Sequence, residues 1–209
     1  ATFCPMGRFQ NLTGQSACLL APAGSFVNFT GASTATLCNV GTYQPSTGSS
    51  TCTPSPAGKF VSITGATAAT SCAAGSYQSA SGASSCVLVP AGTYSTTVGA
   101  TSASSALACP AGRYQDQPGQ TSCIPVPAGT YSTVIGATSS SVAVACAVGK
   151  FTSVSGATVC TNAPAGTYVD HPGATTATSC LAGSYQPSSG ASSCLLVPAG
   201  KYSKPLICS

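Results

Sequence analysis

The chain has 209 residues, of which only 4% are charged, and its formal net charge at pH 7 is +4. A typical soluble domain has about a quarter of its residues charged, so the composition excludes an ordinary bare soluble surface. The basic residues are too few and too scattered for a nucleic-acid-binding patch, and no run of about 18 apolar residues could span a membrane. Serine and threonine total 60 residues, which favours glycosylation or burial in an assembly as the source of solubility.

One frame of glycines and aromatic residues recurs through the chain. It reads Gly-x-[Tyr/Phe]-x4-Gly and occurs eleven times in full, first at Gly7 and Gly14 and last at Gly183 and Gly190, with a truncated copy at Gly200. The frame takes up all 23 glycines and 12 of the 14 aromatic residues. Self-similarity at a short period is typical of stacked structural units, so we expect a repeat protein.

Two kinds of half-repeat alternate. In the Cys-type half, two cysteines with thirteen residues between them bracket the frame, and in the Pro-type half the frame opens with Pro-Ala-Gly. A full repeat spans 34 residues, or 37 where three residues are added before the next cysteine, after Gly99 and Gly136. Insertion at a single point predicts loop growth on one face of a fixed scaffold. The predicted repeats are 4–37, 38–71, 72–108, 109–145 and 146–179, followed by a truncated repeat and tail at 180–209.

Each half-repeat is predicted to be a short β-hairpin. In the second repeat, a strand at 42–44 carries Tyr43, a turn follows at 45–48, and a Ser/Thr-rich return strand at 49–52 ends at a cysteine. The second glycine of the frame suits a turn position with positive φ. Segments 88–90 and 124–127 are expected to be extended linkers, because proline and the residue before it favour that geometry.

The fold class follows from this pattern and from the absence of a sustained apolar period of 3.6 residues. We expect an all-β, small disulfide-rich fold: an elongated tandem array of short β-hairpin half-repeats with little or no helix. A lone hairpin is marginal in water, so stacking should supply the core. The expected core is one column of aromatic rings, and an exposed aromatic platform for carbohydrate or proline-rich peptide is the alternative. The column would hold Phe9, Phe26, Tyr43, Phe60, Tyr77, Tyr94 and their successors.

Thirteen regularly spaced cysteines predict structural disulfides in an oxidising, secreted setting. Zinc sites usually use closely spaced Cys-x2-Cys pairs, which the sequence lacks, so we expect neither a metal nor a cofactor. Pairing across the other intervals, from Cys18–Cys38 to Cys194–Cys208, would leave Cys4 single. The constant interval favours the pairing that leaves Cys208 single, available for a bond to a neighbouring subunit. The favoured pairs are Cys4–Cys18, Cys38–Cys52, Cys72–Cys86, Cys109–Cys123, Cys146–Cys160 and Cys180–Cys194.

Glycosylation is predicted at two kinds of site. Asn11-Leu12-Thr13 and Asn28-Phe29-Thr30 are N-glycosylation sequons, so Asn11 and Asn28 are the expected N-linked sites. Covalent glycans would supply the hydration that the missing charges do not. O-linked glycans are expected on the Ser/Thr tracts at Thr101, Ser102, Ser104, Ser105, Ser139, Ser140 and Ser141.

Catalytic residues are almost absent from the sequence. Asp116, Asp170 and His171 are the only Asp, Glu or His residues, and Asp116 lies more than a repeat away from the other two. A catalytic site needs several convergent groups, so the sequence predicts that the protein is not an enzyme.

Residues 109–115 (Cys-Pro-Ala-Gly-Arg-Tyr-Gln) and 127–132 (Pro-Ala-Gly-Thr-Tyr-Ser) resemble the ephrin-receptor-like cysteine-rich repeat. The resemblance runs from Cys4 to Tyr202. It implies an extracellular module that serves as a spacer or scaffold. The Pro-type halves lack the cysteine that usually precedes the proline, so the resemblance implies about half the usual number of cross-links. This favours a protein stabilised by its neighbours over a free-standing receptor stalk.

These observations predict a secreted structural protein whose leader has been removed. We expect the glycosylated subunit of an extracellular fibril, cell-surface hair or coat, which polymerises head to tail with copies of itself. The alternative is a ligand-binding or spacer segment of an adhesion or receptor ectodomain, with the Asp170–His171 turn and Asp116–Gln117 as its candidate contacts. A third interpretation, an ice-binding repeat, needs a regular flat array of threonines, and the Thr and Ser positions after the second glycine vary too much for it.

Overall fold

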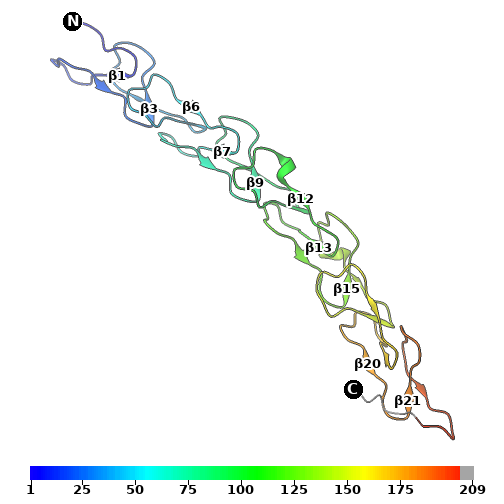
Figure 1. Cartoon of the computed structure of the whole chain (residues 1–209). Coiled ribbons are helices and arrows are strands. Elements are labelled where there is room, and N and C mark those ends of the chain that lie inside the picture. Colours follow the sequence, from blue (N-terminus) through cyan, green and yellow to red (C-terminus); the bar gives the residue numbers. More distant parts are fainter. Residues whose placement is uncertain (203–209) are drawn as a thin grey trace. The chain divides into compact units, whose positions relative to one another are not determined.

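The computed structural model describes residues 1–202 and divides into two compact units. Unit 1 comprises residues 1–90, 95–107 and 119–121, and unit 2 comprises residues 91–94, 108–118 and those from 122 onward. Within each unit, two-stranded hairpins follow one another along the chain (Figure 1). This confirms the predicted all-β, disulfide-rich fold of tandem hairpins. The division into six repeats remains a prediction.

The strands of unit 1 form one antiparallel hairpin per half-repeat. Each strand has two residues, and the first strand of each hairpin carries the aromatic residue of the frame. The pairs are β1 (Arg8–Phe9) with β2 (Leu19–Leu20), β3 (Ser25–Phe26) with β4 (Thr36–Leu37), β5 (Thr42–Tyr43) with β6 (Thr53–Pro54), β7 (Lys59–Phe60) with β8 (Thr70–Ser71), and β9 (Ser76–Tyr77) with β10 (Val87–Leu88).

Unit 2 repeats the same hairpin in the same register. Its pairs are β13 (Arg113–Tyr114) with β14 (Ile124–Pro125), β15 (Thr130–Tyr131) with β16 (Val144–Ala145), β17 (Lys150–Phe151) with β18 (Thr161–Asn162), β19 (Thr167–Tyr168) with β20 (Thr178–Ser179), and β21 (Ser184–Tyr185) with β22 (Leu195–Leu196). The remaining strands are β11 (Thr93–Tyr94) and β12 (Leu107–Ala108).

The return strands lie further along the chain than the sequence predicted. The strand expected at 49–52 is β6, after the cysteine, and the expected linkers at 88–90 and 124–127 contain strand residues of β10 and β14. Proline is tolerated here because of the register. Pro125 lies opposite Arg113, while the next residue, Val126, donates its N–H to the Gly112 carbonyl at 2.9 Å. Pro125 is therefore at a non-hydrogen-bonded position of the ladder, where no N–H is needed.

The two three-residue insertions form short 3-10 helices, η1 (Ala103–Ser105) and η2 (Ser140–Val142). Ser102 and Ser139 cap them, since each side-chain oxygen accepts a bond of 3.1 Å from the N–H two residues on. Each insertion thus adds one turn to a hairpin loop, and in β15–β16 the strand register is the same as in the hairpins without an insertion.

The fully buried core consists of small side chains, so the expected column of buried rings is wrong in part. In unit 1, Ala21, Val27 and Ala32 form a buried cluster, and the half-buried ring of Phe9 packs against it from the preceding half-repeat. The backbones approach too closely to enclose a ring, and the ring instead covers the core of the next half. The matching cluster of unit 2 is Ala163, Val169 and Ala174, with Phe151 packed against it.

The glycines make this close approach possible. All 23 have positive φ, between 69° and 83°. At the first glycine of an internal frame a second constraint is added. A Cβ on Gly41 would overlap the carbonyl oxygen of Gly82, two half-repeats further on, and a Cβ on Gly7 would overlap the carbonyl oxygen of Gly48. Only glycine satisfies both the conformation and the contact.

We predict that Gly41→Ala destabilises the fold far more than Gly14→Ala. Both substitutions place an L-residue at positive φ, which costs about 1–2 kcal/mol. Only the first also forces a Cβ into a backbone carbonyl, whereas a Cβ on Gly14 would meet nothing within 4 Å. Thermal and denaturant unfolding of the two variants would measure the difference. Equal midpoints would show that the contact between Gly41 and Gly82 does not limit the packing.

Candidate functional site: the stacking surface

Consecutive half-repeats are joined by backbone hydrogen bonds at fixed positions of the frame. The first glycine donates its N–H to the residue that follows the aromatic in the next half, as from Gly24 to the Gln44 carbonyl at 2.8 Å. The residue after the aromatic donates in the same direction, as from Val27 to the Ser49 carbonyl at 3.0 Å. Each half therefore satisfies its edge groups on the half that follows it.

The second glycine donates in the opposite direction. Gly48 bonds to the Ala21 carbonyl at 2.7 Å, and Gly65 bonds to the Cys38 carbonyl at 2.8 Å. In unit 2 Gly190 makes the same bond to Ala163 at 2.7 Å. A half-repeat thus presents different groups to its two neighbours.

Like halves also contact like halves. In nine frames, from Gly7 to Gly149, the first glycine faces the second glycine of the frame two halves on, so that Gly7 meets Gly48 between Cys-type halves and Gly24 meets Gly65 between Pro-type halves. We call the resulting series within a unit the Cys column and the Pro column. The disulfides all belong to the Cys column.

The six disulfides span the thirteen-residue interval, with Cα–Cα distances of 5.7–5.8 Å, which suit a disulfide. This is the pairing that the constant spacing favoured, and Cys208 lies outside the described residues. The bonds are Cys4–Cys18, Cys38–Cys52, Cys72–Cys86, Cys109–Cys123, Cys146–Cys160 and Cys180–Cys194.

The Pro-type halves keep the geometry of the disulfide site without its cysteines. In five of the six Pro-type halves, the position of the first cysteine, before the proline, holds a residue whose exposure is 0%, and in the last it holds the half-buried Val197. The position of the second cysteine holds an alanine in the halves without an insertion, and Ala35 packs against the cluster that contains Ala21. Sequence reasoning missed this substitution, although the signal was present in the residue before each proline. The five fully buried residues are Ala21, Ser55, Val89, Val126 and Ala163.

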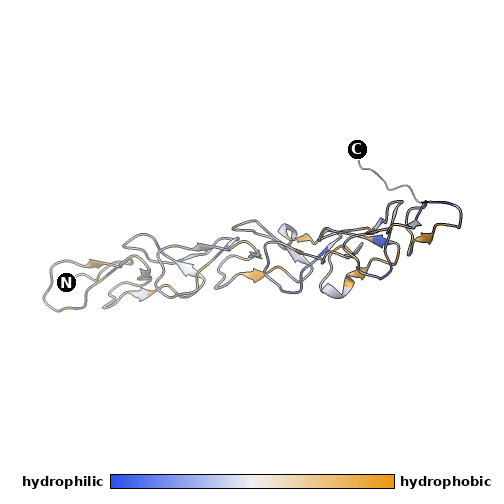
Figure 2. Ribbon diagram, turned by 90° about the horizontal axis from the view of Figure 1, so that it is seen from below, coloured by the Kyte–Doolittle hydropathy of each residue, from blue (hydrophilic) through white to orange (hydrophobic). Residues whose placement is uncertain are grey.

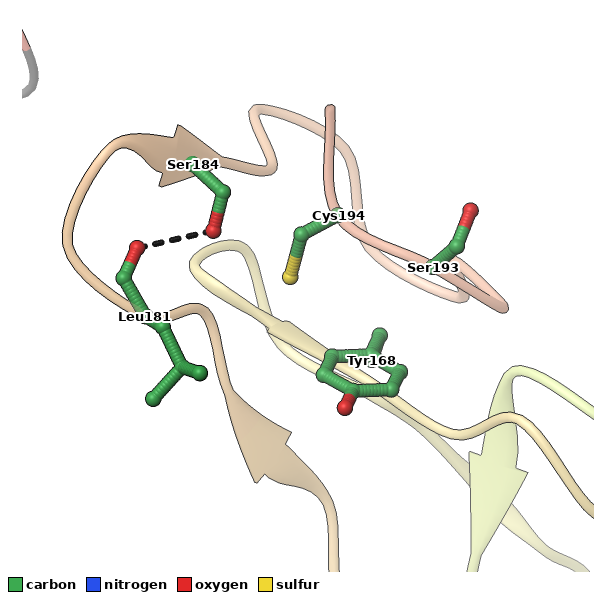
Figure 3. Close-up of a pocket in the computed structure, with 5 residues that line it drawn as sticks. All are labelled: Tyr168, Leu181, Ser184, Ser193 and Cys194. Atoms are coloured by element: carbon green, nitrogen blue, oxygen red, sulfur yellow. Dashed lines mark hydrogen bonds between the residues drawn. The ribbon is translucent and has the colours of Figure 1, made fainter. Parts of the chain in front are cut away.

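Figure 3 shows an aromatic ring of the Pro column, Tyr168 of β19, in the same surface depression as Cys194, a disulfide cysteine of the next half. The two residues line this shallow depression of about 270 Å³ together with Leu181, Ser184 and Ser193. Its lining has hydroxyls, an apolar side chain and a bonded sulfur, but no carboxylate, imidazole or amine that could activate a substrate.

A glutamine closes the turn of the Cys-type hairpins. The side chain of Gln115 is almost fully buried. Its Nε2 donates to the Ser122 carbonyl at 2.9 Å, and its Oε1 accepts from the Gln117 N–H at 3.1 Å. Sequence reasoning missed this brace, although glutamine occurs at this position in five of the six Cys-type halves. The other four are Gln10, Gln44, Gln78 and Gln186, with the same two bonds.

Basic residues recur at one position of the frame. Five of the six stand directly after a first glycine, and the sixth, Lys204, lies outside the described residues. The guanidinium of Arg113 donates to the Cys123 carbonyl at 2.9 Å, and that of Arg8 to Cys18 at 3.1 Å. These two arginines each stabilise a single hairpin. The five basic residues that follow a first glycine are Arg8, Lys59, Arg113, Lys150 and Lys201.

The acidic residues lie in exposed turns of unit 2. His171 and Asp170 are 2.7 Å apart after β19, and the hydrogen bond from the imidazole holds the pKa of the Asp170 carboxyl below its usual value. Asp116 lies in a different half-repeat, after β13. Residues 1–202 contain no group of three His, Cys, Asp or Glu side chains placed to hold a metal ion, so these three do not converge on one centre.

The predicted glycosylation positions lie in hairpin turns and in the inserted loops. Asn11 and Asn28 are exposed, as is Thr101. The hydroxyls of Ser102 and Ser139 are used in capping the 3-10 helices. Of the remaining positions, Ser104, Ser140 and Ser141 are exposed and Ser105 is half-buried.

Comparison with known families agrees with this geometry. The family model described as "Tyrosine-protein kinase ephrin type A/B receptor-like" matches residues 24–72, 69–105 and 107–142, which is more than half of the chain. The chain belongs to the ephrin-receptor-like family. Ephrin-receptor-like repeats are non-catalytic extracellular modules, and they point to an extracellular or cell-surface location. No curated protein matches the chain. Within residues 1–202, no helix is long and apolar enough to cross a membrane.

We predict that Ala21→Cys combined with Ala35→Cys forms a seventh disulfide. The two positions are separated by 14 residues, as in the native bonds, and belong to one packed cluster. A loop of about 15 residues closed in this way should add roughly 3 kcal/mol to the free energy of unfolding. Mass spectrometry after thiol labelling and thermal unfolding would measure both effects.

The matched control is Ala21→Cys with Thr36→Cys, which moves the second thiol one residue along, onto the exposed strand β4. The two introduced thiols of this control should remain reduced or form mixed disulfides. Free thiols in the Ala21/Ala35 variant would mean that the Pro-type halves do not preserve the disulfide geometry.

Proposed function

We propose that this chain is a structural subunit of an extracellular fibril, cell-surface hair or coat, whose copies stack head to tail. The observation that carries the proposal is the recurrence of the stacking contacts. Each half-repeat presents one set of backbone donors and acceptors to the half that follows it and a different set to the half that precedes it. The two sets are complementary. A heterologous contact of this kind is satisfied by any further half-repeat, including one from another copy, and so generates open filaments.

Exposed apolar side chains support the proposal. Phe3, Leu181, Leu196 and Tyr202 are between 81% and 87% exposed, whereas Leu20, which has the place of Leu196 in the first half-repeat, is 46% exposed. Further exposed apolar residues lie on the second strands β2 and β10, and Figure 2 colours hydrophobic residues orange. With so few charges on the surface, contact with other copies would remove this area from water.

Covalent glycans and a cross-link complete the proposed subunit. N-linked glycans on Asn11 and Asn28 and O-linked glycans on the exposed Ser/Thr positions would hydrate the sides of the assembly that stacking leaves open. Cys208 would bond to a neighbouring copy. Secretion of the chain is consistent with both modifications.

A ligand-binding or spacer segment of a receptor or adhesion ectodomain is the second candidate, and family membership favours it. In that case the array would hold a binding surface away from the cell, and the exposed Asp170–His171 turn is its candidate contact. Such a segment would stay dispersed at concentrations where a fibril subunit assembles.

The test is assembly of the purified, oxidised chain, followed by light scattering and negative-stain electron microscopy. We expect filaments for the unmodified chain and dispersed particles for Phe3→Asp, since a carboxylate would be buried at the junction. Ile63→Asp is the control, because Ile63 is also an exposed apolar residue but lies in a hairpin turn. An unmodified chain that stays monomeric at high concentration would rule out the fibril and favour the second candidate.

A further inference from the structure

We propose that three hairpin turns of unit 1 form a lateral contact between copies of the chain in neighbouring filaments, with a two-fold axis at Ile63. The contact residues are Phe29, Ile63 and Val98, which we call the turn row. This inference rests on the proposed fibril and specifies how its filaments associate side by side.

The turn row places large apolar residues where the hairpin does not require them. Phe29, Ile63 and Val98 lie one or two residues before the second glycine of three successive Pro-type halves, and they are 57%, 66% and 66% exposed. All three halves are preceded and followed by others in the chain. The internal Cys-type turns of unit 1, residues 45–47 and 79–81, are also exposed in the same frame but hold Pro-Ser-Thr and Ser-Ala-Ser. Since the frame folds equally well with small and polar residues there, the apolar residues of the turn row are available for contact with a partner.

The three turns are held in the same way. In each, the second glycine donates its N–H to the carbonyl of the first cysteine of the preceding Cys-type half. Every acceptor belongs to a disulfide, so each turn is anchored on a cross-linked hairpin. The turns therefore recur along the Pro column of unit 1 at a constant step. The three bonds are Gly31 to Cys4 at 2.8 Å, Gly65 to Cys38 at 2.8 Å and Gly99 to Cys72 at 2.7 Å.

The lack of charge in the turn row favours a second copy of the chain as its partner. Residues 28–31, 62–65 and 96–99 contain no Asp, Glu, Lys, Arg or His. A charged partner would therefore find no complementary group on these turns. The same turns of another copy supply an uncharged apolar surface with an identical step, so each turn of one copy meets one turn of the other.

The sizes of the side chains favour an antiparallel pair. The turn row reads Phe, Ile, Val along the chain. In an antiparallel, isologous contact Ile63 meets Ile63 at the two-fold axis, and each Phe29 meets a Val98, so the three contacts have similar combined volumes. A parallel pair would set Phe29 against Phe29 and Val98 against Val98, which opens a gap at the valine end and loses its contacts.

The area of the turn row makes the lateral contact depend on stacking. A stable interface buries about 800 Å² on each partner. An aromatic side chain buries about 150–250 Å², so three partly exposed side chains, of which one is aromatic, fall short of that area. Two isolated copies therefore do not hold together through the turn row. Stacked copies present one row after another along a filament, and the contacts then act together.

The test is disulfide trapping in filaments with Ile63→Cys, in a Cys208→Ser background that removes the other proposed cross-link. The chain is produced without glycans, because a glycan on Asn28 would lie beside Phe29 in the same turn. Two Ile63→Cys thiols meet at the two-fold axis, so we expect a covalent dimer on non-reducing gels that is lost on reduction. Filaments of this variant without the dimer would overturn the turn row.

Two further variants determine the direction of the pair. Phe29→Cys alone should give little or no dimer, whereas Phe29→Cys mixed with Val98→Cys should give the mixed dimer. A dimer of Phe29→Cys alone would overturn the antiparallel contact. The matched control is Ala80→Cys, because Ala80 is exposed two residues before the second glycine of a Cys-type half, and its thiol should stay reduced.

Negative-stain electron microscopy of Ile63→Asp provides a second readout. This variant should form single filaments where the unmodified chain forms paired ones, because two carboxylates would meet at the axis, and Ala80→Asp should keep the pairs. Paired filaments from Ile63→Asp, or only single filaments from the unmodified chain, would overturn the turn row and leave the proposed function standing. Absence of filaments from the unmodified chain would overturn both. Binding to phosphatidylcholine vesicles that Ile63→Asp abolishes would overturn the second copy as the partner and identify a membrane contact.

Discussion

At nine first glycines, from Gly7 to Gly149, a positive φ and a carbonyl oxygen in the place of a Cβ together exclude every other residue. The rest of the structure depends on this contact. It brings half-repeats of the same type together and sets the separation between successive backbones, and the fully buried side chains are those of alanine, valine, serine and half-cystine. The aromatic rings, which are too large for that space, lie over the core of the following half. The frame visible in the sequence is therefore primarily a backbone-packing rule, and the rings follow from it.

The two types of half-repeat hold their hairpins closed by different interactions. In the Cys-type half a covalent bond and a glutamine hold the hairpin closed, whereas in the Pro-type half small residues, such as Ala21 and Ala35, fill the place of the bond. A disulfide stabilises mainly by restricting the unfolded chain, and the small residues stabilise by burial against neighbours. The Pro-type half therefore depends more strongly on the halves that contact it. This dependence agrees with a protein whose half-repeats are stable in a stack.

The sequence was sufficient for features governed by local spacing. Hairpins, the scarcity of helix and the turn glycines all follow from a period that can be read directly. The return strands were misplaced because proline was taken as a sign of a linker. At Pro125 the register decides the outcome, and register is a property of two strands that one segment does not reveal. The small-residue core was missed for a related reason: the contact between Gly41 and Gly82 joins residues two half-repeats apart, and nothing in either half alone indicates it. The glutamine brace, by contrast, had a visible signal in its regular position.

The placement of the disulfides has a mechanical consequence. Each bond closes a loop of fixed contour between cysteines 14 positions apart, and these loops cannot lengthen under tension. The intervening segments, such as the one from Cys18 to Cys38, carry no internal disulfide and can be drawn out. A pulling force would therefore open the chain in alternating yielding and inextensible sections, and reducing agents would increase its extended reach by roughly half without cutting the backbone.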